Sequence, residues 1–231
     1  MPAHADIFGE GKGNLAVKII KPYAEIITPI NGDEVLKHIE LCGRVCYKSE
    51  ARITPDSAKR FVASIIRNGH ESVLEHYSFT VRFVCDRGVS HEIVRHRIAS
   101  YSQESTRYCN YGNGDGGITV IAPRFWPEGS EAYGAWLSAV QLAERRYLEL
   151  LHSGATPEEA RAVLPNSLKT EVIMTANLRE WRHFFRLRAA KASHPQMREV
   201  VVPLLDEVRR LIPVVFDDIT GEGPATGESH E

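Results

Sequence analysis

The sequence predicts a helix-rich α+β fold in a single domain, and three observations support this prediction. The chain has 231 residues, of which 43% are hydrophobic and 25% charged, the size and composition of one ordinary globular domain. Helix-like and strand-like patterns follow each other without a regular alternation. No internal repeat or long linker divides the chain. We therefore expect one domain over residues 14–217, between flexible, polar tails at 1–13 and 218–231.

Five stretches have the composition of β-strands. Residues 77–85 (YSFTVRFVC) alternate in polarity and are rich in β-branched and aromatic side chains. Near the start of the chain lie two short β-rich runs, AVKII at 16–20 and EII at 25–27. A short strand is expected at 118–121, and another strand at 168–176.

Apolar residues recur at helical spacing in the segments between these strands. One helix is expected to start with Thr54 as N-cap and Pro55 in its first position. Thr156 and Glu159 have the spacing of a capping box. The polar segment 98–117 ends in the glycine-rich NYGNGDGG and is predicted to be a loop. The expected helices are 33–47, 54–68, 89–97, 130–153, 157–163, 178–190 and 196–211.

Charge and cysteine content limit the classes of function. A net charge of -2 and a pI near 6.6 give no overall attraction to nucleic acid or to an anionic membrane, so any anion site must be local. The four cysteines are too few and too irregularly spaced for a disulfide framework. The N-terminus lacks the layout of a signal peptide, and no apolar run approaches the ~20 residues of a membrane span. These features predict a cytoplasmic protein.

Residues 95–108 (RHRIASYSQESTRY) concentrate groups that bind anions. The segment contains three arginines, one histidine and four serine or threonine residues, against a single glutamate. Guanidinium groups grip phosphate oxygens in pairs, and hydroxyl and backbone N–H groups supply further donors. The segment therefore predicts an anion-binding loop. The alternative is a solvated basic face or a set of structural ion pairs.

A second basic segment, 179–188 (REWRHFFRLR), is amphipathic. A basic helix of this kind is often only a solvated surface. Two separate arginine clusters in a chain of net charge -2 nevertheless favour a polyanionic small ligand such as a nucleotide. The basic stripe is expected to consist of Arg179, Arg182 or His183, and Arg186. The side chains expected to face the core are Trp181, Phe184, Phe185 and Leu187.

The segment 69–76 (GHESVLEH) places two histidines and two glutamates close together. Their spacing differs from HExxH, and no cysteine joins them, so we predict no metal site. Helix-end caps and a polar contact to a cofactor are the favoured roles.

The motif Arg95-His96-Arg97, followed after seven residues by Ser105, resembles the signature of flavin-dependent thymidylate synthases. Other motifs resemble that family in the same order along the chain, and the similarity covers about residues 30–213. These motifs are GHES and LEH in 69–76, STRY at 105–108, ARAVLP at 160–165, TANLREW at 175–181, FFRLR at 184–188 and SHPQM at 193–197.

The resemblance implies the α+β fold particular to that family, with a mixed or antiparallel sheet, and a homotetramer whose active sites lie between subunits. It implies that the domain is catalytic and acts as a methyltransferase that converts dUMP to dTMP. The carbon donor would be 5,10-methylenetetrahydrofolate, released as tetrahydrofolate. FAD, recharged by NADPH, would supply the hydride.

The resemblance also implies roles for individual residues. Arg188 would be catalytic, because a fixed cation beside the uracil ring favours its ionised form. Two positions depart from the family pattern. Glu92 stands where many members have Gln, and His183 stands where some members have Asn. The implied FAD contacts are Ser72, Arg95, His96, Arg97, Gln103, Asn177, Arg179 and His183. The implied dUMP contacts are Glu92, Arg95, Gln103, Glu104, Ser105, Thr106, Arg107, Arg161 and Arg188.

Four alternatives remain from the sequence. Ser105 could act as a nucleophile, although no general base is evident and a binding role is favoured. A nucleic-acid-binding module would use the same arginines but needs a strongly positive domain. A nucleotide hydrolase would need a carboxylate cluster for Mg²⁺, and no paired acidic motif lies near the arginines. An inactive family member would keep the motifs without the chemistry.

Overall fold

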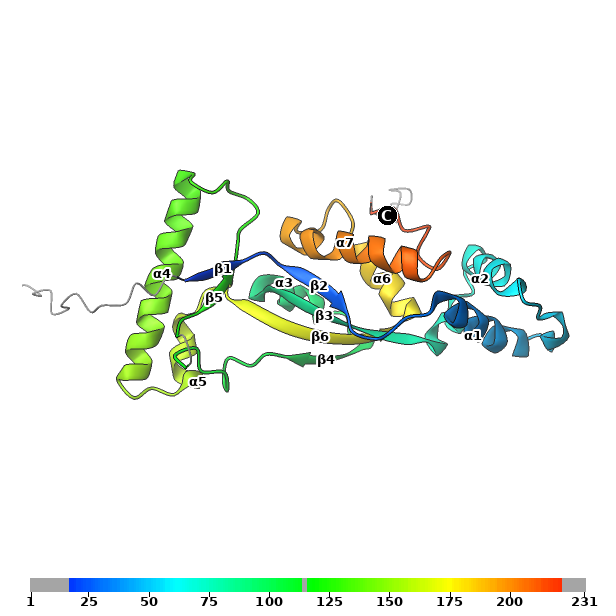
Figure 1. Cartoon of the computed structure of the whole chain (residues 1–231), viewed down its shortest axis with the longest axis horizontal. Helices are drawn as coiled ribbons and strands as arrows, with labels where there is room; N and C mark the ends of the chain where they lie inside the picture. The colour runs from blue at the N-terminus through cyan, green and yellow to red at the C-terminus, as the bar shows by residue number, and fades with distance from the viewer. Residues whose placement is uncertain (1–16, 114–115, 222–231) are drawn as a thin grey trace, which may run out of the picture.

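A computed structural model of the chain describes residues 17–113 and 116–221 (Figure 1). Residues 1–13 and 222–231 of the expected tails lie outside the described residues. The strands are β1 (Lys18–Ile20), β2 (Tyr23–Ile26), β3 (Ser78–Asp86), β4 (Ala99–Gln103), β5 (Thr119–Ile121) and β6 (Lys169–Asn177). The α-helices are α1 (Gly32–Val45), α2 (Ser57–Arg67), α3 (Arg87–Ile93), α4 (Glu131–His152), α5 (Pro157–Ala160), α6 (Leu178–Arg188) and α7 (Pro195–Leu211). The 3₁₀ helices are η1 (Glu50–Arg52), η2 (Glu71–His76) and η3 (Arg161–Val163).

A four-stranded antiparallel sheet with strand order β2-β3-β6-β4 forms the centre of the fold. Strands β3 and β6 pair from Ser78–Asn177 to Asp86–Lys169. A separate parallel pair joins β1 to β5. The fold is therefore α+β with both parallel and antiparallel pairing, as predicted.

The main core lies between one face of the four-stranded sheet and helices α6 and α7 (Figure 1). Residues of β6 alternate between buried and half-buried, which is typical of a sheet with one face packed against the core. Trp181 stacks on Phe79 with ring centroids 4.7 Å apart and donates a hydrogen bond to the Phe79 carbonyl. Large buried aromatic rings of this kind contribute much of the burial energy of a domain and fix how α6 lies on the sheet.

Helix α4 stands at the end of the molecule opposite α1 and α2 (Figure 1). It packs on β1 and β5 through a second, smaller core that includes Val140, Tyr147 and Leu168. The buried Glu144 accepts a hydrogen bond from the Ile118 N–H at 2.9 Å and so ties the helix to β5.

Most predicted elements are confirmed within about two residues, but three predictions were wrong. The predicted loop 98–117 contains β4, which pairs with β6 as a short, polar edge strand. The predicted helix 89–97 ends at Ile93, because Tyr101 donates hydrogen bonds to the carbonyls of Ile93 and His96 and holds the chain in a turn.

The third wrong prediction concerns the start of α2. The helix begins at Ser57 instead of following a Thr54 cap. The Ser57 hydroxyl accepts from the Thr54 N–H at 2.9 Å and donates to Glu40 at 2.7 Å, so residues 54–56 form a turn tied to α1.

Candidate active site

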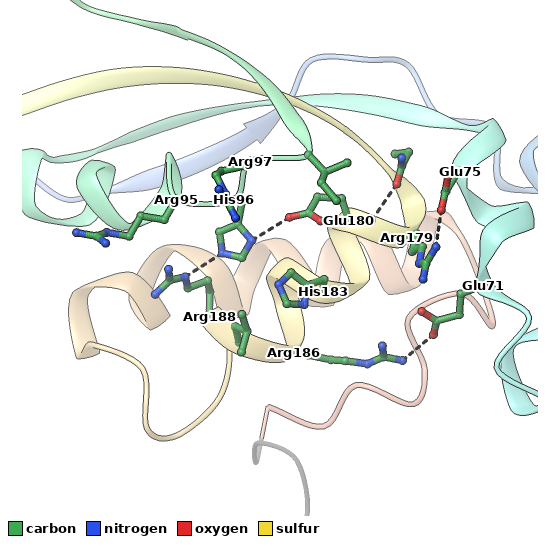
Figure 2. Close-up of a pocket in the computed structure, with 13 residues that line it drawn as sticks. Glu71, Glu75, Arg95, His96, Arg97, Arg179, Glu180, His183, Arg186 and Arg188 are labelled. Carbon is green, nitrogen blue, oxygen red and sulfur yellow. Dashed lines mark hydrogen bonds and ion pairs between the residues drawn. The ribbon is translucent and has the colours of Figure 1, made fainter.

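A cavity of about 670 Å³ opens between η2, the turn after α3, and α6 (Figure 2). Its volume is within the range of small-molecule sites. Five of the residues that line it are arginines. The lining residues are Glu71, Glu75, Arg95, His96, Arg97, Ile98, Asn177, Arg179, Glu180, His183, Arg186, Leu187 and Arg188.

The junction between β6 and α6 places one wall of this cavity. Asn177 ends the strand and caps the helix, and its side-chain oxygen accepts from the Glu180 N–H at 2.9 Å. The Leu178 N–H donates to the Tyr77 carbonyl and fixes the helix start beside η2. Arg179 then reaches Glu75 on η2 at 2.6 Å. Asn177 and Arg179, predicted to contact a cofactor, thus line the cavity together.

The turn after α3 supplies the opposite wall. His96 is buried, whereas Arg95 and Arg97 are exposed. Within 17–113 and 116–221, neither of these two arginines has an ion-pair partner. Two free guanidinium groups on a cavity wall are suited to bind the phosphate groups of a ligand.

A hydrogen-bonded chain runs across the inner part of the cavity (Figure 2). The Glu180 carboxylate lies 3.0 Å from His96 Nδ1, and His96 Nε2 lies 3.1 Å from Arg188 Nε. The other end of the Arg188 guanidinium contacts the Glu92 carboxylate at 2.6 Å and the Glu92 carbonyl at 3.1 Å. Glu92 is therefore the ion-pair partner of Arg188.

Burial has the largest effect on the pKa values of His96 and Glu180 in this hydrogen-bonded series. It lowers the pKa of His96 to about 4, and the positive charges of Arg188 and His183 act in the same direction. His96 is therefore neutral at neutral pH. Burial also raises the pKa of Glu180.

Of the two alternatives for the middle of the basic stripe predicted on α6, His183 lines the cavity with Arg179 and Arg186, whereas Arg182 is fully buried. Its guanidinium grips Asp218 with two bonds of 2.7 and 2.6 Å, lies 3.0 Å from Glu71, and donates to the Val215 carbonyl. Arg186 shares Glu71 at 2.9 Å. Leu187, predicted for the core, is 46% exposed and lines the cavity instead.

Arg182 and Leu187 are thus the two residues of α6 that lie on a different face from the one inferred from polarity. Arg182 can be buried because two carboxylates and a carbonyl satisfy it, and a sequence pattern does not show such partners. Although burial alone would raise the pKa of Glu71, Arg186 and Arg182 lower it below its ordinary value.

A second cluster of predicted site residues lies outside the cavity. Arg161 donates to the Thr106 hydroxyl at 3.3 Å, and Arg107 pairs with Glu158 at 2.9 Å. Glu104 is held by Lys169 at 2.9 Å and by the Tyr111 hydroxyl at 2.8 Å. The residues that line the cavity do not include Glu104, Ser105, Thr106, Arg107 or Arg161.

The remaining predicted residues have separate surroundings. Gln103 donates to the hydroxyls of Ser90 at 3.0 Å and Thr170 at 3.3 Å. Ser72 is exposed on η2, next to Glu71. The structure thus brings together one half of the predicted site and leaves the other half apart within one chain.

His96, Glu180 and His183 form a group whose possible ligand atoms lie within 4.8 Å of one another, counting described residues only. Both nitrogens of His96 are already engaged, one by Arg188 and one by Glu180. The group is therefore better suited to hydrogen bonding than to metal binding.

Sequence reasoning missed Glu180 as part of this site, whereas Glu71 and Glu75 lie in segment 69–76, for which helix-end caps and a polar contact to a cofactor were the favoured roles. An acidic residue in the first turn of a helix is common for electrostatic reasons alone, so Glu180 carried no special signal.

Comparisons with known proteins show the family of this chain. Residues 30–214 match the family described as thymidylate synthase complementing protein. A flavin-dependent thymidylate synthase from Geobacter sulfurreducens is 37% identical over 200 residues, which cover 84% of this chain and 85% of the relative. One from Pyrococcus abyssi is 36% identical over 164 residues, or 71% and 67% of the two chains.

A solved structure shares the fold. It is a UMP/dUMP methylase, PolB from Streptomyces cacaoi bound with 5-Br dUMP, with a TM-score of 0.72 and 23% identity. The match covers 87% of this chain and 96% of that one.

The α+β fold and the arginine-lined cavity are suited to a polyanionic small ligand, and the relatives place the chain among methyltransferases. The chain belongs to the thymidylate synthase complementing protein family, that of the flavin-dependent thymidylate synthases. Across residues 17–113 and 116–221, none of the helices has the length and apolar character needed to cross a membrane.

Proposed function

We propose that this chain methylates dUMP to dTMP with FAD as its flavin, NADPH as reductant and 5,10-methylenetetrahydrofolate as carbon donor. The observation that supports the proposal most directly is Arg188. Its guanidinium is fixed at three points on the wall of an arginine-lined cavity, where a flat, ionisable ring can meet it.

The charged lining of the cavity is suited to a flavin dinucleotide. Arg95 and Arg97 carry free guanidinium groups suited to a pyrophosphate, and Asn177, Arg179 and His183 line the same space. His96 contributes the buried end of this wall. Ser72 and Gln103 complete the proposed FAD contacts. When bound, a reduced flavin supplies a hydride, and the protein contributes binding, orientation and electrostatics.

The second cluster is proposed to hold the nucleotide. Arg107 and Arg161 would bind the dUMP phosphate, with Ser105 and Thr106 as hydroxyl donors. Arg107 lies in a half-exposed ion pair with Glu158, so exchanging that partner for a phosphate costs little. Glu92, Arg95, Gln103 and Glu104 complete the set.

The proposed chemistry assigns a definite task to Arg188. Its fixed positive charge stabilises a negative charge on the uracil ring, which makes ring carbon C5 a better nucleophile toward the one-carbon unit. Because Arg188 is only 19% exposed, little water screens that charge. C5 would then bond to the one-carbon unit and lose its own hydrogen as a proton, the bond from that unit to the folate would break to release tetrahydrofolate, and a hydride would complete the methyl group.

The separation of the two clusters favours an active site shared between subunits. In one chain the cavity and the cluster around Arg107 and Arg161 are apart, yet the reaction needs flavin and uracil together. A homotetramer that sets the cavity of one subunit against the nucleotide cluster of another satisfies both conditions. We propose that this assembly acts in the cytoplasm and engages neither nucleic acid nor membrane.

The proposed function is tested under anaerobic conditions with purified protein loaded with FAD. NADPH is added with and without dUMP, and the visible flavin absorbance is followed. Bleaching by NADPH, followed by reoxidation and dTMP formation once methylenetetrahydrofolate is added, is the expected result. A protein that binds no FAD, or whose reduced flavin yields no dTMP, would refute the proposal.

A further inference from the structure

Glu180 is a buried acidic residue to which the proposed function assigns no task. Its side chain is 7% exposed, and the first turn of α6 holds it rigidly because the Asn177 cap binds its backbone N–H. Its carboxylate oxygen lies 3.0 Å from His96 Nδ1. Burial of a carboxylate costs free energy unless a hydrogen-bond donor or a cation is its partner.

The contacts of His96 determine which ring nitrogen carries the proton. Arg188 has only donors, so the His96 Nε2 atom, 3.1 Å from Arg188 Nε, must accept with its lone pair. His96 is neutral, so its single ring proton lies on Nδ1. That N–H then donates to Glu180, which makes the carboxylate the group that stabilises this tautomer.

The tautomer in turn affects how Arg188 is held. With the proton on Nε2, the ring would direct an N–H at the Arg188 N–H, and the two donors would repel. The guanidinium would then keep only its two contacts to Glu92 and could rotate about them. A catalytic cation must be fixed before the reaction begins, since preorganisation is the source of its electrostatic effect.

We propose that Glu180 is a positioning residue for Arg188 and acts by locking the Nδ1–H tautomer of His96. This inference rests on the proposed function, because it gains its purpose from the task of Arg188 at the uracil ring. Glu180 itself need not touch flavin or substrate. Its role is to present one hydrogen-bond acceptor at a fixed place.

A matched pair of variants separates the acceptor from the rest of the side chain. Glu180→Gln keeps an acceptor oxygen at nearly the same position, whereas Glu180→Leu keeps the volume and removes the acceptor. Loss of one charge-assisted hydrogen bond corresponds to about a tenfold or greater fall in rate. We expect Glu180→Leu to lower kcat by about tenfold or more with a smaller change in KM, and Glu180→Gln to stay within about threefold.

A spectroscopic measurement tests the tautomer without relying on activity. In protein labelled with ¹⁵N-histidine and assigned with His96→Gln, the wild type is expected to show a protonated Nδ1 and an unprotonated Nε2. Glu180→Gln should keep this pattern, and Glu180→Leu should shift it toward the other tautomer. A wild-type His96 with its proton on Nε2 would overturn the inference, even if Glu180→Leu failed to fold.

Rates and spectra together distinguish the possible failures. Equal kcat values for Glu180→Leu and wild type, with FAD bound in both, would overturn the positioning role. If the wild type itself forms no dTMP, the proposed function fails, while the ¹⁵N pattern still decides whether Glu180 sets the tautomer.

Discussion

At the scale of single residues, the site combines arginines with opposite tasks. Arg182 is fully buried and fully paired, so it stabilises the fold, whereas Arg95 and Arg97 are exposed and free to meet a ligand. Arg188 lies between these extremes, held by Glu92 and His96 yet facing the cavity. The charge of a residue does not distinguish these tasks. The number and kind of its partners do.

Arg188→Ala is expected to abolish dTMP formation while leaving FAD binding intact. The variant removes the cation proposed to stabilise the ionised ring but leaves Arg95 and Arg97 in place. Arg188→Lys should also lose most activity, because the lysine ammonium cannot make the same set of contacts as the planar guanidinium. Flavin absorbance measures binding, and product analysis measures dTMP. Exposed Arg210→Ala on α7 is the control, and near-normal turnover by Arg188→Ala would remove Arg188 from its role.

Arg107→Ala is expected to weaken dUMP binding by about 1.5–3 kcal/mol, the contribution of one charge-assisted hydrogen bond. The folded state should lose little, since the Arg107–Glu158 pair is 49% exposed on both sides. Titration calorimetry with dUMP measures the change. Arg146→Ala, which breaks a similarly exposed pair with Glu149, should leave the affinity unchanged. An Arg107→Ala protein that binds dUMP normally contradicts the assignment.

At the scale of elements, α6 connects the core, the cavity and the end of the described chain. Its apolar residues pack on β3, and its first turn helps to form the cavity. On its third side, Arg182 binds Asp218 and Glu71 and so holds the segment after α7 against η2. Asp218, assigned at first to a flexible tail, is therefore engaged by the fold.

Asp218→Asn is expected to destabilise the protein by about 1–2 kcal/mol at neutral pH. The loss is smaller than for a fully buried pair because Asp218 is 47% exposed and Glu71 remains beside Arg182. Asp206→Asn makes the same chemical change in an exposed pair with Arg209, and it should cost less. Urea unfolding measures both.

The same unfolding experiment should show that the stability difference between wild type and Asp218→Asn depends on pH. Burial alone would raise the pKa of Asp218, but Arg182 and Arg186 lower it. A lowered folded-state pKa means that the ionised form stabilises the fold above the ordinary pKa of an aspartate. That contribution is lost as the pH falls through the lowered value. The gap between wild type and Asp218→Asn should therefore narrow as the pH falls below the ordinary pKa of an aspartate. A gap independent of pH would contradict the role of this pair.

At the scale of the whole molecule, the cavity and the nucleotide cluster are separate features of one chain. If active sites form between subunits, Arg188 and Arg107 of a working site come from different chains. Mixing Arg188→Ala with Arg107→Ala protein, after dissociation and reassembly, should then restore activity to about a quarter of the wild type. The assay uses a dUMP concentration too low to fill the weakened Arg107→Ala site, so neither variant alone has a working site. Light scattering measures the tetramer, and an inactive mixture of tetramers would show that both residues act from one chain.

Much of the fold was predictable from local patterns. The apolar spacing of α1, α4 and α7 and the alternation in β3 place those elements within about two residues. The prediction missed β4 because this five-residue edge strand (ASYSQ) is mostly polar and lacks the apolar alternation typical of a strand. Its pairing with β6 is also long-range in the sequence. The start of α2 was misplaced because Ser57 makes its hydrogen bonds with Thr54 and with Glu40 on another helix.

The sequence by itself determined the family, the two arginine-rich segments and the fold class, because motifs and periodicity are local properties of the chain. The tertiary structure was needed to show that Arg182 is buried, that Glu92 pairs with Arg188, and that Glu180 lies within hydrogen-bond distance of His96. Each of these depends on contacts between residues far apart in the chain. Burial changes the free energy of a charged side chain more than its neighbours in the sequence do. The role of such a residue therefore depends on the groups that surround it in space.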